Sequence, residues 1–145
     1  MELNHWEKVA GSFFYVGFTV RGPGTVTSAL VFLIAWWISN PVLLIALLAL
    51  LPLSFYLAYR FEKCIGNDPS SFTMDEVIGS LIVVVCMSHN LWYYLAFFTV
   101  WRLLDIFKPL FKPVEQIQQG IGIMLDDIIG GLTTAGAYYL FVFLN

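Results

Sequence analysis

Charged side chains are scarce in this chain, and the few present are unevenly placed. Seven Lys or Arg and ten Asp or Glu occur among 145 residues, which is 12% of the chain, against roughly 25% in an ordinary soluble domain. Residues 22–59, 77–101 and 128–145 contain none of these four types, so 81 positions carry no charge. A water-soluble helical protein needs charge on the outer face of nearly every helix. The distribution therefore excludes a soluble globule.

Two further shortages exclude other classes of protein. The net charge of −3 shows no basic excess, so we expect no nucleic-acid partner. Cysteine is limited to Cys64 and Cys86, and neither has a His or another Cys at ligand spacing. We therefore expect isolated thiols and no zinc site. Apolar types, by contrast, make up 59% of the chain at a mean hydropathy of +0.80, which excludes a disordered protein.

The apolar residues form runs that turn signals separate. Residues 26–38 and 42–59 flank Ser39-Asn40-Pro41, a turn signal because the residue before Pro avoids the α region. This pattern predicts a helical hairpin. Residues 77–87 and 91–104 flank Ser88-His89-Asn90, and here two interpretations stay open. A single helix would extend about 42 Å, which is long for a bilayer, so we favour a second hairpin. Residues 121–144 are predicted to form a last helix.

We therefore predict an all-α fold, an integral membrane helical bundle of about four to five helical segments, with short or re-entrant helices among them. Residues 1–145 would form a single domain. In this up-and-down arrangement, the basic residues at 60–63 and 102–112 lie on one side, which the positive-inside rule makes cytoplasmic. We expect a multi-pass protein of the cell inner (cytoplasmic) membrane. His89 would lie at the opposite end, as a turn or headgroup histidine.

Acidic residues gather where the apolar runs meet polar segments. Asp75-Glu76 opens the third run, Asp105 lies near the end of the fourth, and Asp126-Asp127 lies about one turn inside the last. Adjacent carboxylates are costly to bury without a cation or a shared proton. We expect these acids to converge on one membrane face, where Mg²⁺ would neutralise them. Mg²⁺ beside Arg102 and Lys108 suits a phosphate ester, because the metal polarises the phosphoryl oxygen and activates water.

Small residues follow two of these acidic positions at helical spacing. Gly79 and Ser80 follow Glu76, and Gly130 and Gly131 follow Asp127, at i+3 and i+4 in both cases. Small faces allow membrane helices to approach closely. We expect them to draw the two acidic helix starts together.

Four sequence blocks together resemble the phosphatidylglycerophosphatase A family, in the family's order and over about residues 17–135. The blocks are Gly-Pro-Gly-Thr at 22–25 followed by Ser28, Asp-Glu-Val-Ile-Gly at 75–79, Arg-Leu-Leu-Asp-Ile-Phe-Lys-Pro at 102–109, and Gly-Ile-Gly-Ile-Met-Leu-Asp-Asp at 120–127. The last block is the most specific.

The resemblance implies an all-helical, Mg²⁺-dependent phosphatase that converts phosphatidylglycerophosphate, its phospholipid substrate, to phosphatidylglycerol and inorganic phosphate. It implies active-site residues of three kinds. The metal ligands would be Glu76, Asp105, Asp126 and Asp127; the catalytic acids Asp127, Asp126 and Asp75; the substrate contacts Arg102, Lys108, Thr25, Ser28 and Arg21. Attack by water and an aspartyl-phosphate intermediate both stay open.

Two other functions remain as alternatives. A small membrane cation transporter would also use intramembrane acids, although it would hold them near the middle of the membrane. A non-enzymatic helix-packing subunit would explain the glycines but not the acids.

Overall fold

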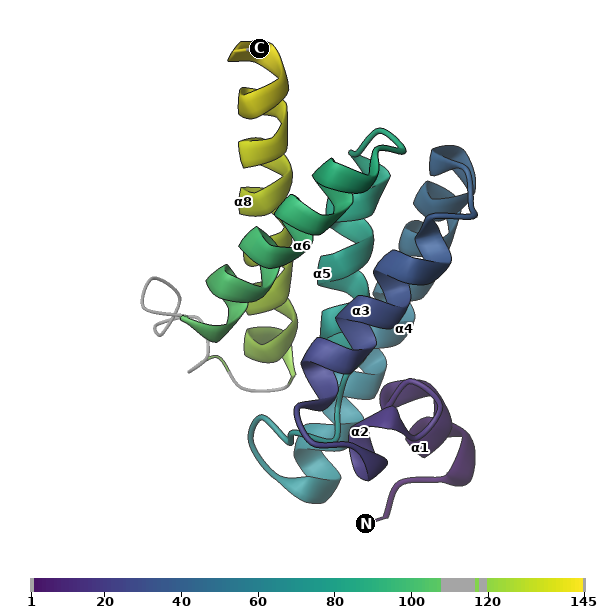
Figure 1. The fold of residues 1–145 in the computed structure, drawn as a ribbon. Coiled ribbons are helices and arrows are strands. Elements are labelled where there is room, and N and C mark those ends of the chain that lie inside the picture. Colours follow the sequence, from purple (N-terminus) through teal and green to yellow (C-terminus); the bar gives the residue numbers. More distant parts are fainter. Residues whose placement is uncertain (1, 108–116, 118–119, 145) are drawn as a thin grey trace.

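The computed structural model describes residues 2–107, 117 and 120–144, and all secondary structure among these residues is helical. Two short helices come first, followed by five longer ones (Figure 1). The helices are α1 (His5–Gly11), α2 (Val16–Thr19), α3 (Pro23–Ala35), α4 (Asn40–Ile65), α5 (Met74–Val85), α6 (Leu91–Ile106) and α8 (Ile121–Leu144). The predicted all-α bundle is confirmed.

The five longer helices run up and down, with α5 in the middle of the bundle (Figure 1). Helix α5 packs against α3, α4, α6 and α8, and nine of its residues are buried. The starts of α3, α5 and α8 and the ends of α4 and α6 all lie at one end of the bundle. The turns after α3 and α5 lie at the other. The charged segments that the structure describes therefore return to the same end, as the hairpin interpretation requires.

The second hairpin is confirmed by a break between α5 and α6. Helix α5 ends at Val85 and α6 begins at Leu91, with Asn90 as its N-cap. The Asn90 side chain accepts hydrogen bonds from the backbone N–H groups of Trp92 (2.9 Å) and Tyr93 (3.4 Å), which stabilises a new helix start. His89 is exposed in this turn, far along the bundle from the acidic residues, in agreement with its predicted location.

Among the described helices, α4 and α8 are long and apolar enough to cross a membrane. They have 26 and 24 residues, or about 39 and 36 Å, enough to cross a hydrocarbon core of about 30 Å. Only 22% and 33% of their most apolar windows are buried inside the protein, unlike the core helix of a soluble protein. Helices α3, α5 and α6 have 13, 12 and 16 residues, too few to cross alone. The chain is thus a membrane protein that combines long and short helices.

An ion pair attaches the N-terminal segment to the charged end of α4. The Glu7 carboxylate is fully buried and accepts hydrogen bonds from Arg60 Nε at 2.7 Å, Tyr56 Oη at 3.0 Å and the Asn4 backbone N–H at 2.8 Å. These donors, led by Arg60, outweigh the effect of burial and lower the pKa of Glu7 from 4.5 to about 2. Glu7 therefore carries its charge at neutral pH and fixes α1 against α4.

Glycines bring α5 and α8 into backbone contact next to the acidic residues. A Cβ on Gly131 would lie 2.8 Å from the Gly79 carbonyl oxygen, and a Cβ on Gly79 would lie 3.1 Å from the Asp127 carbonyl oxygen. Such distances leave no room for a side chain. The expected role of the small residues is confirmed, because they place the start of α5 beside the start of α8.

Candidate active site

Three carboxylates from three helices converge at the charged end of the bundle. Glu76 lies in the first turn of α5, Asp105 in the last turn of α6 and Asp127 in the second turn of α8. One carboxylate oxygen from each lies within 4.8 Å of the others. Residues up to 51 positions apart in the chain thus form one cluster. Its oxygen atoms are spaced as a metal ion would require.

Arg102 lies beside this cluster and links it to α3. Its Nη1 donates to Glu76 Oε2 at 2.5 Å and to Ser28 Oγ at 3.2 Å. Its Nη2 lies 2.8 Å from Asp105 Oδ2 and donates to Thr25 Oγ1 at 3.1 Å. These contacts engage four of the five guanidinium N–H groups. Arg102 therefore orients Glu76 and Asp105, and its predicted contact with phosphate stays a prediction.

The buried side chains of Ser28 and Trp101 hold Arg102 and its partner Glu76 in place. Ser28 Oγ donates to Glu76 Oε2 at 3.0 Å, and Trp101 Nε1 lies 3.4 Å from Ser28 Oγ and 3.2 Å from Ser80 Oγ. Trp101 has 0% exposure. A Cβ on Gly79 or Gly130 would lie 2.5 or 2.8 Å from its ring. Gly79 and Gly130 thus leave room for the Trp101 ring. Trp101 in turn positions Ser28, and Ser28 positions the candidate metal ligand Glu76.

A polar pocket of about 470 Å³ opens over the carboxylates. The start of α3 forms one wall with Gly22, Pro23, Gly24 and Thr25, and the 66–73 segment forms another. Helix N-termini bind anions because their first N–H groups have no partner inside the helix. The pocket wall therefore contains both a helix start and the three carboxylates of the cluster.

Among the described residues, Arg102 forms ion pairs with Glu76 and Asp105, two members of the three-carboxylate cluster. Burial and then the neighbouring Asp105 raise the pKa of the Glu76 carboxyl group, against the opposing effect of Arg102. A divalent cation would relieve this repulsion. The hard oxygen donors present are the type that Mg²⁺ prefers.

The remaining predicted acids are placed differently. Asp75 is half-buried and lines the polar pocket, and its Oδ1 accepts the Glu76 backbone N–H at 2.9 Å. Asp126 is buried at 3% exposure but belongs neither to the three-carboxylate cluster nor to the pocket wall. Adjacent helical residues point about 100° apart, which explains why Asp127 alone of the pair reaches the cluster. The predicted roles of Asp75 and Asp126 stay predictions.

Predicted substrate contacts are brought together only in part. Thr25 lines the pocket, whereas Ser28 lies behind it, bonded to Glu76 and Arg102. Arg21 is exposed and is not among the residues of the pocket wall. Lys108 lies outside the described residues. Of the predicted substrate contacts, Thr25 and Arg102 thus line the pocket where a ligand would meet them.

Several residues of the site were not singled out from the sequence as site residues. Asp68 and Ser70 line the polar pocket from the 66–73 segment, and Trp101 supports Ser28. A loop residue and an aromatic residue in an apolar run carry no local signal of such a role, because their positions depend on how the helices pack.

The comparisons with known proteins agree with this geometry. The sequence model of the phosphatidylglycerophosphatase A family matches residues 9–142, nearly the whole chain. The chain belongs to this family. It is 32% identical over 146 aligned positions to "Phosphatidylglycerophosphatase A" of Escherichia coli, covering 94% of this chain and 83% of that protein. It is also 33% identical over 136 positions to a "Putative phosphatidylinositol-3-phosphatase" of Bacteroides thetaiotaomicron, covering 84% of each. No solved structure matches.

Family membership fixes the general activity. The phosphatidylglycerophosphatase A family and both relatives identify the chain as a lipid phosphatase, a hydrolase with a phospholipid substrate. The expected membership, the enzyme class and the membrane association are confirmed. The three-carboxylate cluster is accordingly its candidate active site.

Proposed function

We propose that the chain is a Mg²⁺-dependent phosphatase that hydrolyses phosphatidylglycerophosphate to phosphatidylglycerol and inorganic phosphate. The observation that carries this proposal is the convergence of Glu76, Asp105 and Asp127 within 4.8 Å, under a pocket that the start of α3 also lines. This arrangement offers a cation site and an anion site side by side. A phosphate monoester bound through a metal ion needs both.

The donor set fits Mg²⁺. Three carboxylates offer hard oxygen ligands, and Mg²⁺ in phosphate-processing sites is held by a few carboxylates together with water and substrate oxygens. The ion would be held by Glu76, Asp105 and Asp127. Asp126, which precedes Asp127 on α8, is a further expected ligand. When bound, Mg²⁺ would polarise the phosphoryl group and offset its negative charge.

The chain's own residues would bind and orient the phosphate. The start of α3 lines the pocket, and the backbone N–H groups of Gly24 and Thr25, which follow Pro23 in the first turn of this helix, suit phosphate oxygen atoms. The Thr25 hydroxyl accepts from Arg102, so its own proton can be donated to a substrate oxygen. Arg102 fixes the carboxylates of Glu76 and Asp105, and its guanidinium, with Lys108 and Arg21, would supply the positive charge that developing negative charge requires. Asp75 and Asp127 are the acids we expect to handle protons or act as nucleophile.

We further propose that this end of the bundle faces the cytoplasm in a multi-pass inner-membrane protein. The basic residues Arg60, Lys63 and Arg102 lie at the same end as the acids, whereas the turns at the other end carry no Lys or Arg. This bias follows the positive-inside rule. The acids also lie at helix ends, not at mid-membrane. That location disfavours the alternative of a cation transporter. The alternative of a helix-packing subunit is disfavoured as well, because helix packing does not require three converging carboxylates.

A second candidate substrate follows from the Bacteroides relative, whose name assigns it to phosphatidylinositol 3-phosphate. A substrate panel tests both possibilities. Protein purified in detergent is incubated with phosphatidylglycerophosphate, phosphatidylinositol 3-phosphate and phosphatidic acid, and released phosphate is measured. We expect phosphatidylglycerophosphate to have the highest kcat/KM of the three substrates. Glu76→Gln should abolish its hydrolysis, whereas the control Glu2→Gln, at an exposed position, should leave it unchanged. Preference for phosphatidylinositol 3-phosphate would overturn the assigned headgroup.

A further inference from the structure

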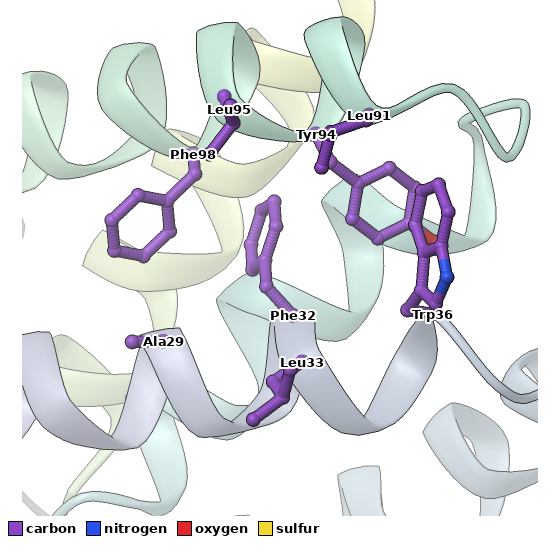
Figure 2. Close-up of a pocket in the computed structure, with 8 residues that line it drawn as sticks. All are labelled: Ala29, Phe32, Leu33, Trp36, Leu91, Tyr94, Leu95 and Phe98. Carbon is purple, nitrogen blue, oxygen red and sulfur yellow. The ribbon is translucent and has the colours of Figure 1, made fainter.

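A second hollow lies on the bundle away from the polar pocket, between α3 and α6. This α3–α6 groove has a volume of about 260 Å³, and apolar side chains form its wall. Figure 2 shows the side chains of α3 facing those of α6 across it. The α3 side comprises Ala29, Phe32, Leu33 and Trp36, and the α6 side includes Leu95 and Phe98.

The groove has a buried floor and exposed edges. Phe32 is 5% exposed, whereas Leu33 and Leu95 at its edges are 63% and 53% exposed. Phe32 meets the rings of Phe98 and Tyr94 edge to face, with centroids 5.2 and 5.8 Å apart. Such ring pairs hold their geometry well. The groove is thus built into the two helices and opens outward, where a membrane protein meets lipid chains.

The groove begins where the polar pocket ends. On α3, Ala29 follows the pocket residue Thr25 by one helical turn, and on α6, Phe98 precedes the pocket residue Arg102 by one turn. One turn is about 5.4 Å. Trp36 lies eleven positions after Thr25, so the groove reaches about 16 Å along α3 from the polar pocket. The same pair of helices therefore carries a polar site at its charged end and an apolar channel leading away from it.

We propose that the α3–α6 groove holds an acyl chain of the phospholipid substrate while its phosphate occupies the polar pocket. This inference rests on the proposed function, since it requires a lipid phosphate ester in the pocket. In phosphatidylglycerophosphate a glycerol, a phosphodiester and a second glycerol separate the terminal phosphate from the acyl chains, so the headgroup would fill the polar pocket and the chains would leave at its edge. The α3–α6 groove starts one helical turn beyond the pocket residues Thr25 and Arg102, where such a chain would emerge. The wall of the groove is almost wholly apolar and matches a hydrocarbon chain, with the Tyr94 hydroxyl and the Trp36 indole as its polar side-chain groups.

Filling the groove tests the proposal. Leu33→Trp and Leu95→Trp place a large ring at its edges, and Leu140→Trp does the same on α8 at a matched exposure of 60%. Phosphatidylglycerophosphate with 18-carbon chains and its water-soluble four-carbon analogue serve as substrates. We expect each groove variant to raise KM for the long-chain substrate about tenfold, the loss from about two displaced methylene groups. KM for the four-carbon substrate and the Leu140→Trp values should stay unchanged. Equal KM values across all three variants would overturn the proposal.

A labelling experiment keeps the proposal testable if a variant folds poorly or if the headgroup assignment fails. The wild-type protein is irradiated with phosphatidic acid that carries a diazirine midway along one chain, and labelled peptides are mapped. We expect labels in 29–36 and 91–98 that excess unlabelled phosphatidic acid removes and excess phosphatidylcholine does not. Labels spread over α4 and α8, or competition by phosphatidylcholine, would show a general lipid surface and overturn the proposal. The protein could instead form dimers that Leu33→Trp disrupts while the labelling of α4 and α8 stays unchanged. That result would show that the groove is an interface between copies of the chain and would equally overturn the proposal.

Discussion

Replacing Gly24 by alanine should inactivate the enzyme while leaving it folded. Gly24 lies in the first turn of α3, and a Cβ there would lie 2.0 Å from Glu76 Oε1, whereas ordinary contact starts at 3.4 Å. The carboxylate must therefore move by about 1.4 Å, the difference between these distances. A displacement of about 1 Å in a catalytic arrangement can reduce the rate about 100-fold. We expect kcat to fall by that factor, about 2.7 kcal/mol of barrier.

Folding should tolerate the same substitution. The atom in the way is the end of a flexible side chain, and Gly24 has an ordinary helical backbone. Alanine also favours a helix over glycine by up to about 1 kcal/mol. The matched control is Gly136→Ala on α8, where a Cβ meets nothing within 4 Å. Phosphate release and thermal unfolding in detergent are measured for both variants. Gly24→Ala with more than half of the wild-type kcat would refute the reasoning that the location of Glu76 controls the reaction.

Three further perturbations have defined outcomes. Asp127→Asn removes one carboxylate of the cluster and should abolish phosphate release with an unchanged thermal midpoint; retained turnover would contradict its assignment. Glu7→Gln leaves Arg60 without its buried partner and should reduce the free energy of unfolding by about 3 kcal/mol, measured by denaturant titration. Since the pKa of Glu7 is lowered to about 2, wild-type stability from this pair is complete above pH 4.5 and lost toward pH 2, and the variant should lack that loss. Gly131→Ala would push α8 from Gly79, whose carbonyl oxygen lies 2.8 Å from the new Cβ; activity and midpoint should fall together, and full activity would contradict the close-packing argument.

Much of the fold followed from the placement of charge and apolar runs. A break at Ser88-His89-Asn90 was favoured because a single helix would be long for a bilayer, and the structure separates the two helices at 86–90. The convergence of Glu76, Asp105 and Asp127 followed from the same topology, since helix ends on one side of a small bundle lie close together. The glycines after Glu76 and Asp127 showed which two helices touch. Local patterns sufficed because each of these features depends on helix direction and end position.

Side-chain partners were harder to predict than helix ends. Arg102 was expected to contact phosphate, and that contact stays a prediction. Its guanidinium also bonds Glu76 and Asp105, because a cation between two carboxylates makes charge-assisted hydrogen bonds to both. The Glu7 and Arg60 ion pair joins residues 53 positions apart, and nothing in either local sequence signals the other. The direction in which the Asp126 side chain points depends on how α8 is rotated about its own axis. The α3–α6 groove arises from the spacing between two helices, which hydrophobicity alone does not specify.

The central claim is that Glu76, Asp105 and Asp127 form a divalent metal site at which a lipid phosphate ester is hydrolysed. Its most direct test is phosphate release from phosphatidylglycerophosphate by the purified protein, measured after EDTA treatment and again during titration with Mg²⁺. We expect EDTA to abolish release and Mg²⁺ to restore it, with Asp105→Asn requiring at least tenfold more Mg²⁺ for half of its maximal rate. Release that continues at the full rate in EDTA would contradict the claim.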